Sequence, residues 1–216
     1  MTHVEKPVIS VDQAGNVPQI ELEARWDLPA MPLRVVVLCH PHPLQRGTMN
    51  APLMNALAEA LVERDFAVFR FNFRGVGRST GTHDFGDGER DDTAAAVGAA
   101  SKEYPNLPIG VAGWSFGAVT SLRWQARDKS HLPWVGIAAP VNNSRSLPLP
   151  PGPELADARR ALIVGDRDQF TTVDETEEYA TAIKADLNVL EGSDHFFYFR
   201  EERVAALVAF GLSEPV

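Results

Sequence analysis

The sequence predicts an α/β fold, in which a mostly parallel, twisted sheet of about seven or eight strands carries helices on both faces. Short apolar segments typical of buried strands alternate with segments of helical periodicity along most of the 216 residues. Two strand-like segments near the N-terminus follow each other without a helix between them, which predicts an antiparallel edge. No internal repeat or boundary interrupts the pattern, so we expect one domain over residues 1–216.

The N-terminal part of the chain predicts the strands Val8–Val11 and Ile20–Trp26, joined by a turn at Gln13–Asn16. In the second strand apolar and charged residues alternate, as in a strand with one face exposed. The next segment, Val35–Cys39, is continuously apolar. That pattern is typical of a strand covered on both faces.

The same reasoning extends to the C-terminus. The later strands are expected at Ala67–Phe71, Ile109–Ala112, Trp134–Ala139, Ala161–Val164 and Leu187–Leu190. Helices are expected after Asn50 as N-cap, with Leu53, Leu57 and Leu61 on one face, and at Gly88–Glu103, Ala118–Trp124, Val173–Lys184 and Glu201–Leu212. Leu147–Pro153 is rich in proline and predicts an extended loop, leaving room for only one short helix near Glu154–Ala158 before the next strand.

Composition excludes several classes of function. A net charge of −9 and a pI near 5.1 argue against binding to nucleic acids or to an anionic membrane surface. No apolar run is long enough to span a membrane, and Met1–Ser10 lacks the features of a signal peptide. The single cysteine excludes an internal disulfide and fits a reducing compartment. We therefore expect a cytoplasmic protein, as a monomer or homodimer.

The segment Gly113-Trp114-Ser115-Phe116-Gly117 lies between an expected strand and an expected helix. A serine between two glycines in this setting is typical of a nucleophile elbow. The turn is so sharp that side chains two residues before and after the serine would collide, and glycine removes them. The alternative is a tight strand–helix turn with an ordinary serine, and the positions of the other polar residues decide between the two.

Polar residues follow several strands at the edge where ligands bind in parallel sheets. A nucleophilic serine needs a base, and the base needs a carboxylate to orient it. Of the six histidines only His195 lies after the candidate acids, so the order Ser115, Asp168, His195 has one possible base. Asp166 is the alternative acid, but Asp168 lies deeper in the turn. Otherwise His195 would cap a helix or fill the core.

Hydrolysis through such a serine needs N–H donors for a developing oxyanion. The N–H of Phe116 is one, because it opens the helix after the serine. The second is expected in the loop after Val35–Cys39, where Pro41 and Pro43 have no N–H, which leaves His42 or Leu44, and we favour His42. Cys39, His40 and His42 lack further ligands of matching spacing, so we expect no metal site and a core role for Cys39.

At this point the chain resembles the α/β-hydrolase superfamily over nearly its whole length. His40-Pro41-His42-Pro43-Leu44, the stretch Arg70–Ser79, Gly88-Glu89 and the elbow together are similar to small bacterial hydrolases of the dienelactone-hydrolase type. The resemblance implies a cofactor-free serine hydrolase acting on an ester, thioester or amide. The group usually has two glycines after the His-Pro-His-Pro-Leu stretch, and here the first is Arg46, which either crowds the acyl side of the pocket or meets an anionic group.

The preferred hypothesis is a carboxylesterase that cleaves a small-molecule ester or thioester. A peptidase or amidase would use the same residues, and a ligand-binding module on a retained hydrolase fold is a third hypothesis. Because a lid is not expected, the serine should face an open cleft. Its walls would be the His40–Thr48 loop, Trp114 and Phe196–Phe199.

Overall fold

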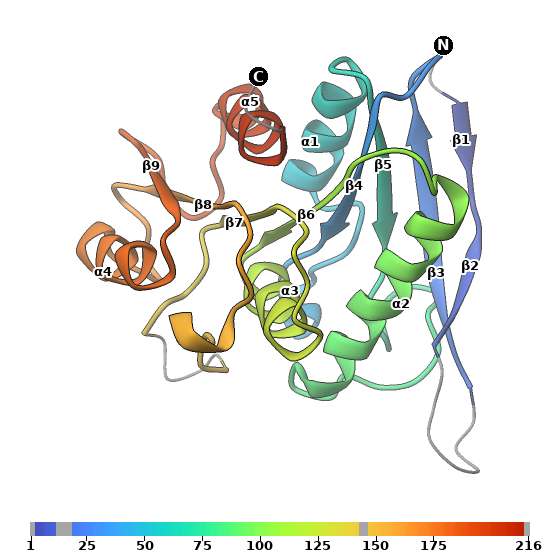
Figure 1. Ribbon diagram of the computed structural model, residues 1–216, viewed down its shortest axis with the longest axis horizontal. Coiled ribbons are helices and arrows are strands. Elements are labelled where there is room, and N and C mark those ends of the chain that lie inside the picture. Colours follow the sequence, from blue (N-terminus) through green and yellow to red (C-terminus); the bar gives the residue numbers. More distant parts are fainter. Residues whose placement is uncertain (1–2, 12–18, 143–146, 214–216) are drawn as a thin grey trace.

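The computed structural model describes residues 3–11, 19–142 and 147–213, and in this part of the chain a twisted sheet runs through the centre of the molecule (Figure 1). The sheet has nine strands in the order β1-β3-β5-β4-β6-β7-β8-β9, and β2 pairs with β3. The strands are β1 His3–Glu5, β2 Val8–Val11, β3 Ile20–Leu28, β4 Arg34–Cys39, β5 Phe66–Phe71, β6 Ile109–Trp114, β7 Trp134–Ile137, β8 Arg160–Gly165 and β9 Asp186–Leu190.

Strands β4 to β9 run parallel to one another, as the sequence predicts. β4 shows why a continuous apolar run is needed at the centre of such a sheet. Val35, Val37 and Cys39 face one core cluster, whereas Val36 and Leu38 face the other. All five side chains are buried, so neither face of β4 meets water.

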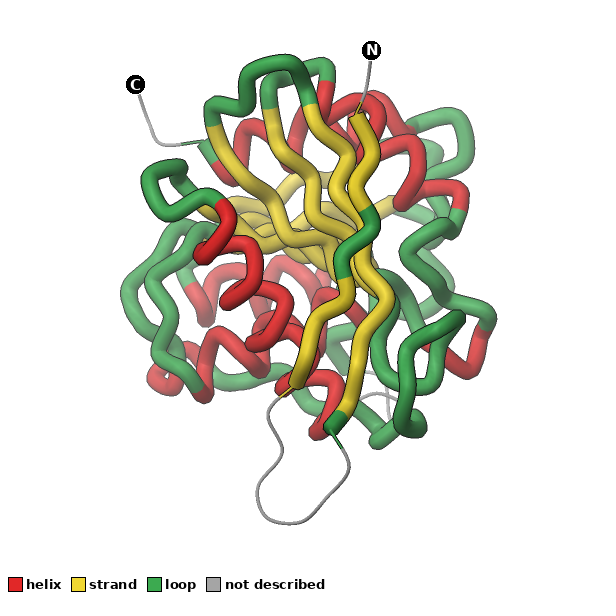
Figure 2. The backbone as a smooth tube through the Cα atoms, turned by 90° about the vertical axis from the view of Figure 1, so that its right-hand side faces the viewer, coloured by secondary structure: helices red, strands yellow, loops and turns green. Residues whose placement is uncertain are grey.

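The N-terminal strands form the antiparallel edge that the sequence predicts. β2 and β3 pair antiparallel, and β3 pairs antiparallel with β5. β1 also pairs with β3 and is a strand that the sequence analysis did not anticipate. Figure 2 looks onto this edge, with helices on both sides of the sheet. The expected turn at Gln13–Asn16 lies outside the described residues.

Two helix layers cover the sheet (Figure 1). α1 (Pro52–Val62) and α5 (Glu201–Leu212) share one face, whereas α2 (Asp87–Glu103), α3 (Phe116–Arg127) and α4 (Val173–Ile183) pack on the other. The expected apolar face of α1 is present, because Leu53, Leu57 and Leu61 are all buried in one core cluster.

The start of α1 corrects one expectation. The residue at the N-cap is Ala51, not Asn50, and its side chain makes no capping hydrogen bond. The cause is Pro52, whose fixed φ suits the first helical position and which has no N–H that needs a cap. Asn50 instead accepts a hydrogen bond at its carbonyl from Asn55 Nδ2, at 2.8 Å.

The connection between β7 and β8 contains little helix in its described part, residues 138–142 and 147–159. The prolines at 148, 150 and 151 lie in extended chain, as expected. The short helix is a single 3₁₀ turn at Gly152–Glu154, so its predicted place near Glu154–Ala158 is wrong. Pro153 explains the shift, because its fixed φ favours the first turn of a helix. In the described residues no helix of this connection lines the cavity beside Ser115.

Candidate active site

Ser115 stands at the sharp turn between β6 and α3. Its backbone has φ 54° and ψ −116°, a conformation that costs energy for any residue with a Cβ. A Cβ on Gly113 would lie 2.4 Å from the backbone of Gly117, and one on Gly117 would lie 2.2 Å from the carbonyl oxygen of Cys39. Both glycines are therefore required for this close approach, as the sequence pattern predicts.

Three side chains from three loops form a continuous hydrogen-bonded chain. His195 Nε2 lies 3.0 Å from Ser115 Oγ, and His195 Nδ1 lies 2.8 Å from Asp168 Oδ2. The carboxylate can only accept, so Nδ1 carries the proton and Nε2 is free to accept the serine proton. His195 is also fixed through its backbone, since its carbonyl accepts a hydrogen bond from Trp114 Nε1 at 3.1 Å.

The two candidate aspartates play different structural parts. The side chain of Asp168 is fully buried, and its second oxygen accepts the N–H groups of Phe170 at 2.8 Å and Thr171 at 3.3 Å. Asp166 accepts the N–H of Ser193 at 3.1 Å and makes no contact with His195. The geometry thus brings Asp168, and not Asp166, to the imidazole.

Phe116 and His42, two of the expected oxyanion-hole residues, have backbone N–H groups with no acceptor within the described residues. Phe116 is the first residue of α3, so its N–H has no partner in the helix. The N–H of His42 is also unpaired. That of Leu44 is not, because it donates to His42 Nδ1 at 3.2 Å, and the Leu44 side chain is exposed. Of the two expected candidates in this loop, the structure leaves His42 with the available donor.

Cys39 ends β4 and His40 follows it, and both side chains are completely buried. Burial raises the pKa of the Cys39 thiol to about 12 and lowers the pKa of His40 to about 4. His40 Nε2 accepts the N–H of Phe73 at 3.0 Å, and Nδ1 lies 2.6 Å from the carbonyl oxygen of Pro41. Its two ring nitrogens thus fix the start of the loop that carries His42. Among the described residues no group of three or more histidine, cysteine or acidic side chains is arranged to hold a metal ion.

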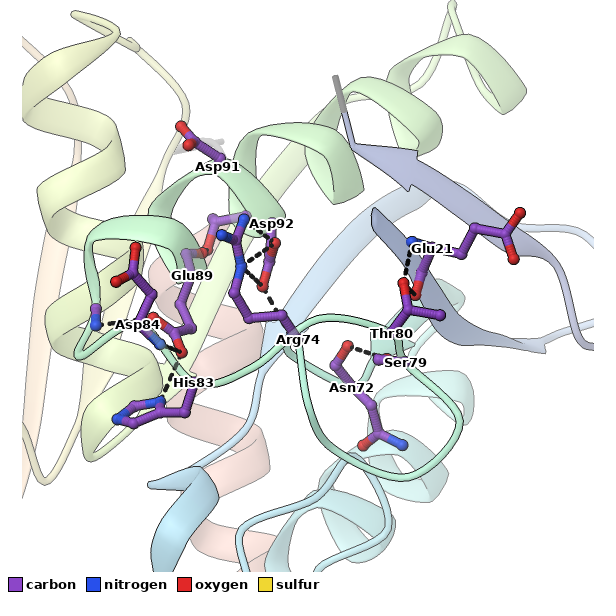
Figure 3. Close-up of polar contacts among 12 residues, drawn as sticks. Glu21, Asn72, Arg74, Ser79, Thr80, His83, Asp84, Glu89, Asp91 and Asp92 are labelled. Carbon is purple, nitrogen blue, oxygen red and sulfur yellow. Dashed lines mark hydrogen bonds and ion pairs between the residues drawn. The ribbon is translucent and has the colours of Figure 1, made fainter. Parts of the chain in front are cut away.

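Figure 3 shows a second carboxylate–histidine pair, formed by Glu89 of α2 and His83 of the preceding loop. Glu89 is fully buried, lies 2.6 Å from His83 Nδ1, and accepts the N–H of Gly86 at 2.7 Å. The His83 ring packs against His42 at 5.2 Å and against Phe116 at 5.5 Å between ring centroids. His83 thus contacts the side chains of both His42 and Phe116, the two residues considered above as oxyanion-hole donors.

A buried ion pair between Arg74 and Asp92 holds the loop after β5 against α2 (Figure 3). Arg74 Nη2 lies 2.6 Å from Asp92 Oδ1, and the Arg74 N–H donates to Asp92 Oδ2 at 2.9 Å. Burial raises the pKa of Asp92, while the hydrogen bonds from Arg74 oppose that shift. Removing one partner would leave a buried charge unpaired, so this pair fixes the loop firmly against α2.

An open cavity of about 190 Å³ lies beside Ser115. Its lining consists of Pro41, His42, Gln45, Arg46, Gly47, Ala51, Pro52, Leu53, Trp114, Ser115, Phe170, His195, Phe196, Tyr198 and Glu201. Arg46 supplies the permanent positive charge in this lining and Glu201 the carboxylate. The expected walls contribute through residues 41–42 and 45–47, Trp114, Phe196 and Tyr198, whereas Phe197 is buried and Phe199 is not part of the lining. Residues 51–53, Phe170 and Glu201 also line the cavity and were not expected there.

Sequence reasoning missed some residues of this site. Phe170 and Glu201 line the cavity, and Glu89 pairs with His83, whose ring packs against His42, yet none of the three was a candidate site residue. For Glu89 the sequence showed an acid in the first turn of a helix, which the helix dipole explains equally well, and a place in the family resemblance, but neither signal pointed to His83. Phe170 had a usable signal, since it follows the expected acid by two residues.

Comparison with known proteins shows the family of this chain. The family model described as serine aminopeptidase, S33, matches residues 31–163, more than half of the chain, including the elbow but not Asp168 or His195. An uncharacterised protein of Rickettsia prowazekii is 30% identical over an alignment of 209 positions, which covers 89% of this chain and 84% of the relative.

Among solved structures, α/β serine hydrolases are similar to this chain over almost its whole length. An α/β serine hydrolase homologue from Coxiella burnetii is 30% identical, with a TM-score of 0.79 over 97% of each chain. A serine hydrolase from Xanthomonas campestris, described as lacking a lid, is 28% identical, with a TM-score of 0.77 over 98% of this chain and 97% of that one. The chain therefore belongs to the serine hydrolases of the α/β-hydrolase superfamily, in the family described as serine aminopeptidase, S33, and has the fold of their lidless members.

Proposed function

We propose that this chain is a carboxylesterase that cleaves an ester or thioester of a small molecule through an acyl-enzyme intermediate. The observation that carries the proposal is the unbroken hydrogen-bonded chain from Asp168 through His195 to Ser115, next to an open cavity. Such a chain supplies an activated nucleophile and the base that activates it.

In the first half of the reaction, His195 Nε2 takes the proton of Ser115 Oγ as the oxygen bonds to the substrate carbonyl carbon. Asp168 holds the imidazole in the required tautomer and stabilises the imidazolium that forms. His195 then gives the proton to the leaving oxygen or sulfur as its bond to carbon breaks. An alcohol or thiol departs, and the acyl group remains on Ser115.

The negative charge that develops on the carbonyl oxygen needs donors that are already in place. We assign this role to the N–H groups of Phe116 and His42, which have no acceptor in the described residues. In the second half, His195 takes a proton from water as the water oxygen bonds to the acyl carbon. The bond between that carbon and Ser115 Oγ then breaks, and His195 returns the proton to Oγ. The products are a carboxylic acid and the free enzyme.

An exopeptidase acting on a free amino terminus is the second candidate, since the matching family model is described as serine aminopeptidase. Such an enzyme needs a group that binds the substrate ammonium, and Glu201 places a carboxylate in the cavity lining. The same lining carries Arg46, which would repel an ammonium group, and this favours the esterase.

The experiment is a parallel measurement of kcat/KM on a p-nitrophenyl ester, the matching thioester and an aminoacyl p-nitroanilide, each with wild type and Glu201→Gln. We expect hydrolysis of the ester and thioester at rates that Glu201→Gln leaves within a few fold. Faster cleavage of the anilide, lost in Glu201→Gln, would contradict the esterase and support the peptidase. No turnover of any substrate would favour a ligand-binding module.

A further inference from the structure

Three aromatic rings stand exposed beside Ser115. Phe170, Phe196 and Tyr198 line the cavity, and they retain 40%, 39% and 58% of their accessible surface. We name these three side chains the aromatic platform. Large apolar rings gathered at the mouth of a cavity, instead of in the core, are typical of a ligand-binding surface.

The rings of the platform are fixed by their neighbours. Phe196 stacks on Tyr198 with 5.8 Å between centroids and 25° between planes, and meets the buried Trp114 edge-on at 6.3 Å and 82°. Phe170 lies edge-on to His195 at 4.6 Å and 64°. The platform thus keeps its shape without a ligand, which lowers the entropy lost on binding.

The backbone of the same loop is strained. Phe197 and Phe199, which flank Tyr198, have φ values of 55° and 63°, in the left-handed region that disfavours side chains of this size. Phe197 is completely buried in the core cluster below α1 and α5 and anchors the loop. Backbone strain that is maintained by burial is concentrated at functional sites, and here it presents Phe196 and Tyr198 to the cavity.

The position of the platform indicates which part of a substrate it meets. His195 must deliver its proton to the leaving atom, so the leaving group lies beside its ring. Phe170 and Phe196 flank that ring, with centroids 4.6 Å and 5.6 Å away. The unpaired N–H groups that fix the carbonyl oxygen come instead from the loop after β4 and the start of α3.

We propose that the aromatic platform binds an aromatic ring in the leaving group, and that the substrates are esters of aryl or arylalkyl alcohols. This inference rests on the proposed esterase function, because it uses the position of the leaving group in that reaction. It goes beyond that function in naming the chemical class of the alcohol and the residues that select it.

The test compares benzyl acetate with cyclohexylmethyl acetate, whose leaving groups differ in aromaticity but not in carbon number, by kcat/KM in a pH-stat. The variants are Phe196→Leu and Tyr198→Leu, which keep apolar bulk but remove the ring. Phe199→Leu is the matched control, because Phe199 is 91% exposed in the same loop and does not line the cavity. Each platform variant should lower the benzyl-to-cyclohexylmethyl ratio about two- to twelvefold, the size of one aromatic contact. Phe199→Leu should leave the ratio unchanged.

A ratio that neither platform variant changes, or that Phe199→Leu changes equally, would overturn the inference. The inference would also be overturned if the platform variants changed only the ratio of kcat/KM for methyl phenylacetate to that for methyl cyclohexylacetate. In these two esters the ring lies in the acyl group, so the platform would then bind the acyl side of the substrate. A separate readout distinguishes this failure from failure of the esterase proposal. Binding of the same acetates to Ser115→Ala, followed by tryptophan fluorescence, should show the same change in ratio with Phe196→Leu even if no ester is hydrolysed.

Discussion

Replacing Asp168 by asparagine is the sharpest perturbation of the proposed mechanism. The carboxylate is buried and holds His195 Nδ1 with one oxygen and two backbone N–H groups with the other. Asparagine is nearly isosteric, and its carbonyl oxygen can keep the backbone hydrogen bonds. Its NH2 group would then face Nδ1, so the imidazole would carry its proton on Nε2 and could not accept the proton of Ser115.

The size of the loss follows from this tautomer change. Loss of the orienting carboxylate in a triad of this kind lowers kcat by up to about 10⁴, or about 5 kcal/mol of transition-state stabilisation. Asp166→Asn is the matched control, since Asp166 lies in the same turn and only accepts the N–H of Ser193. Asparagine can accept that bond too, so this variant should lose less than about tenfold in kcat.

The assay is steady-state hydrolysis of p-nitrophenyl acetate, with circular dichroism to show that both variants fold. We expect kcat to fall by several orders of magnitude for Asp168→Asn, with KM little changed. Equal losses for the two variants, or a larger loss for Asp166→Asn, would refute the assignment of the orienting acid.

Three other predictions follow from the structure. No helix in the described part of the β7–β8 connection covers the cleft, so little of a long acyl chain would be buried there, and each buried methylene is worth only about 0.8 kcal/mol. The value of kcat/KM on p-nitrophenyl esters should therefore peak at short chains, with no rate increase above the critical micelle concentration. A maximum at palmitate would contradict this. Burial lowers the pKa of His40 to about 4 in the folded protein, against 6.5 in the unfolded chain, so the unfolded chain binds the proton first as the pH falls. The free energy of unfolding should therefore decrease by up to about 3 kcal/mol between pH 6.5 and pH 4. Urea unfolding of wild type should give a lower free energy of unfolding at pH 5.0 than at pH 7.5, and His40→Gln should reduce this difference. An unchanged difference in His40→Gln would count against the role of His40. Arg46 has a left-handed backbone, φ 63° and ψ 21°, which glycine adopts readily, so Arg46→Gly should fold with stability within about 1 kcal/mol of wild type. The variant loses a positive charge that attracts an anionic acyl group, so its hydrolysis of an anionic acyl ester relative to a neutral one should fall by up to about fivefold. A rise in that ratio would show that Arg46 only crowds the pocket.

Much of this architecture could be predicted because it depends on local patterns. The buried strands follow from continuous apolar runs such as Val35–Cys39, and the elbow follows from two glycines at fixed spacing around Ser115. His195 could be singled out because no other histidine follows the candidate acids. The choice of Asp168 over Asp166 rested on depth in a turn, and the structure brings Asp168 to the imidazole.

The remaining features depend on contacts between distant segments. Which N–H in the loop after β4 stays unpaired depends on whether the His42 ring turns back to accept the N–H of Leu44, and nothing in the sequence fixes that torsion. Burial of Glu89 against His83 could not be read from an acid in a helical first turn. The N-cap of α1 was misplaced at Asn50 because the preference of Pro52 for the first helical position outweighed the capping preference of asparagine.

The central claim, that Ser115 is an activated nucleophile, is tested most directly by covalent labelling with an alkyl fluorophosphonate. Oγ would displace fluoride at phosphorus, while His195 takes up the serine proton. The account predicts one phosphonyl adduct per chain by intact mass, located on the peptide that contains Ser115, and no adduct on Ser115→Ala or on denatured protein. An unlabelled wild-type chain, or equal labelling of Ser115→Ala, would contradict it.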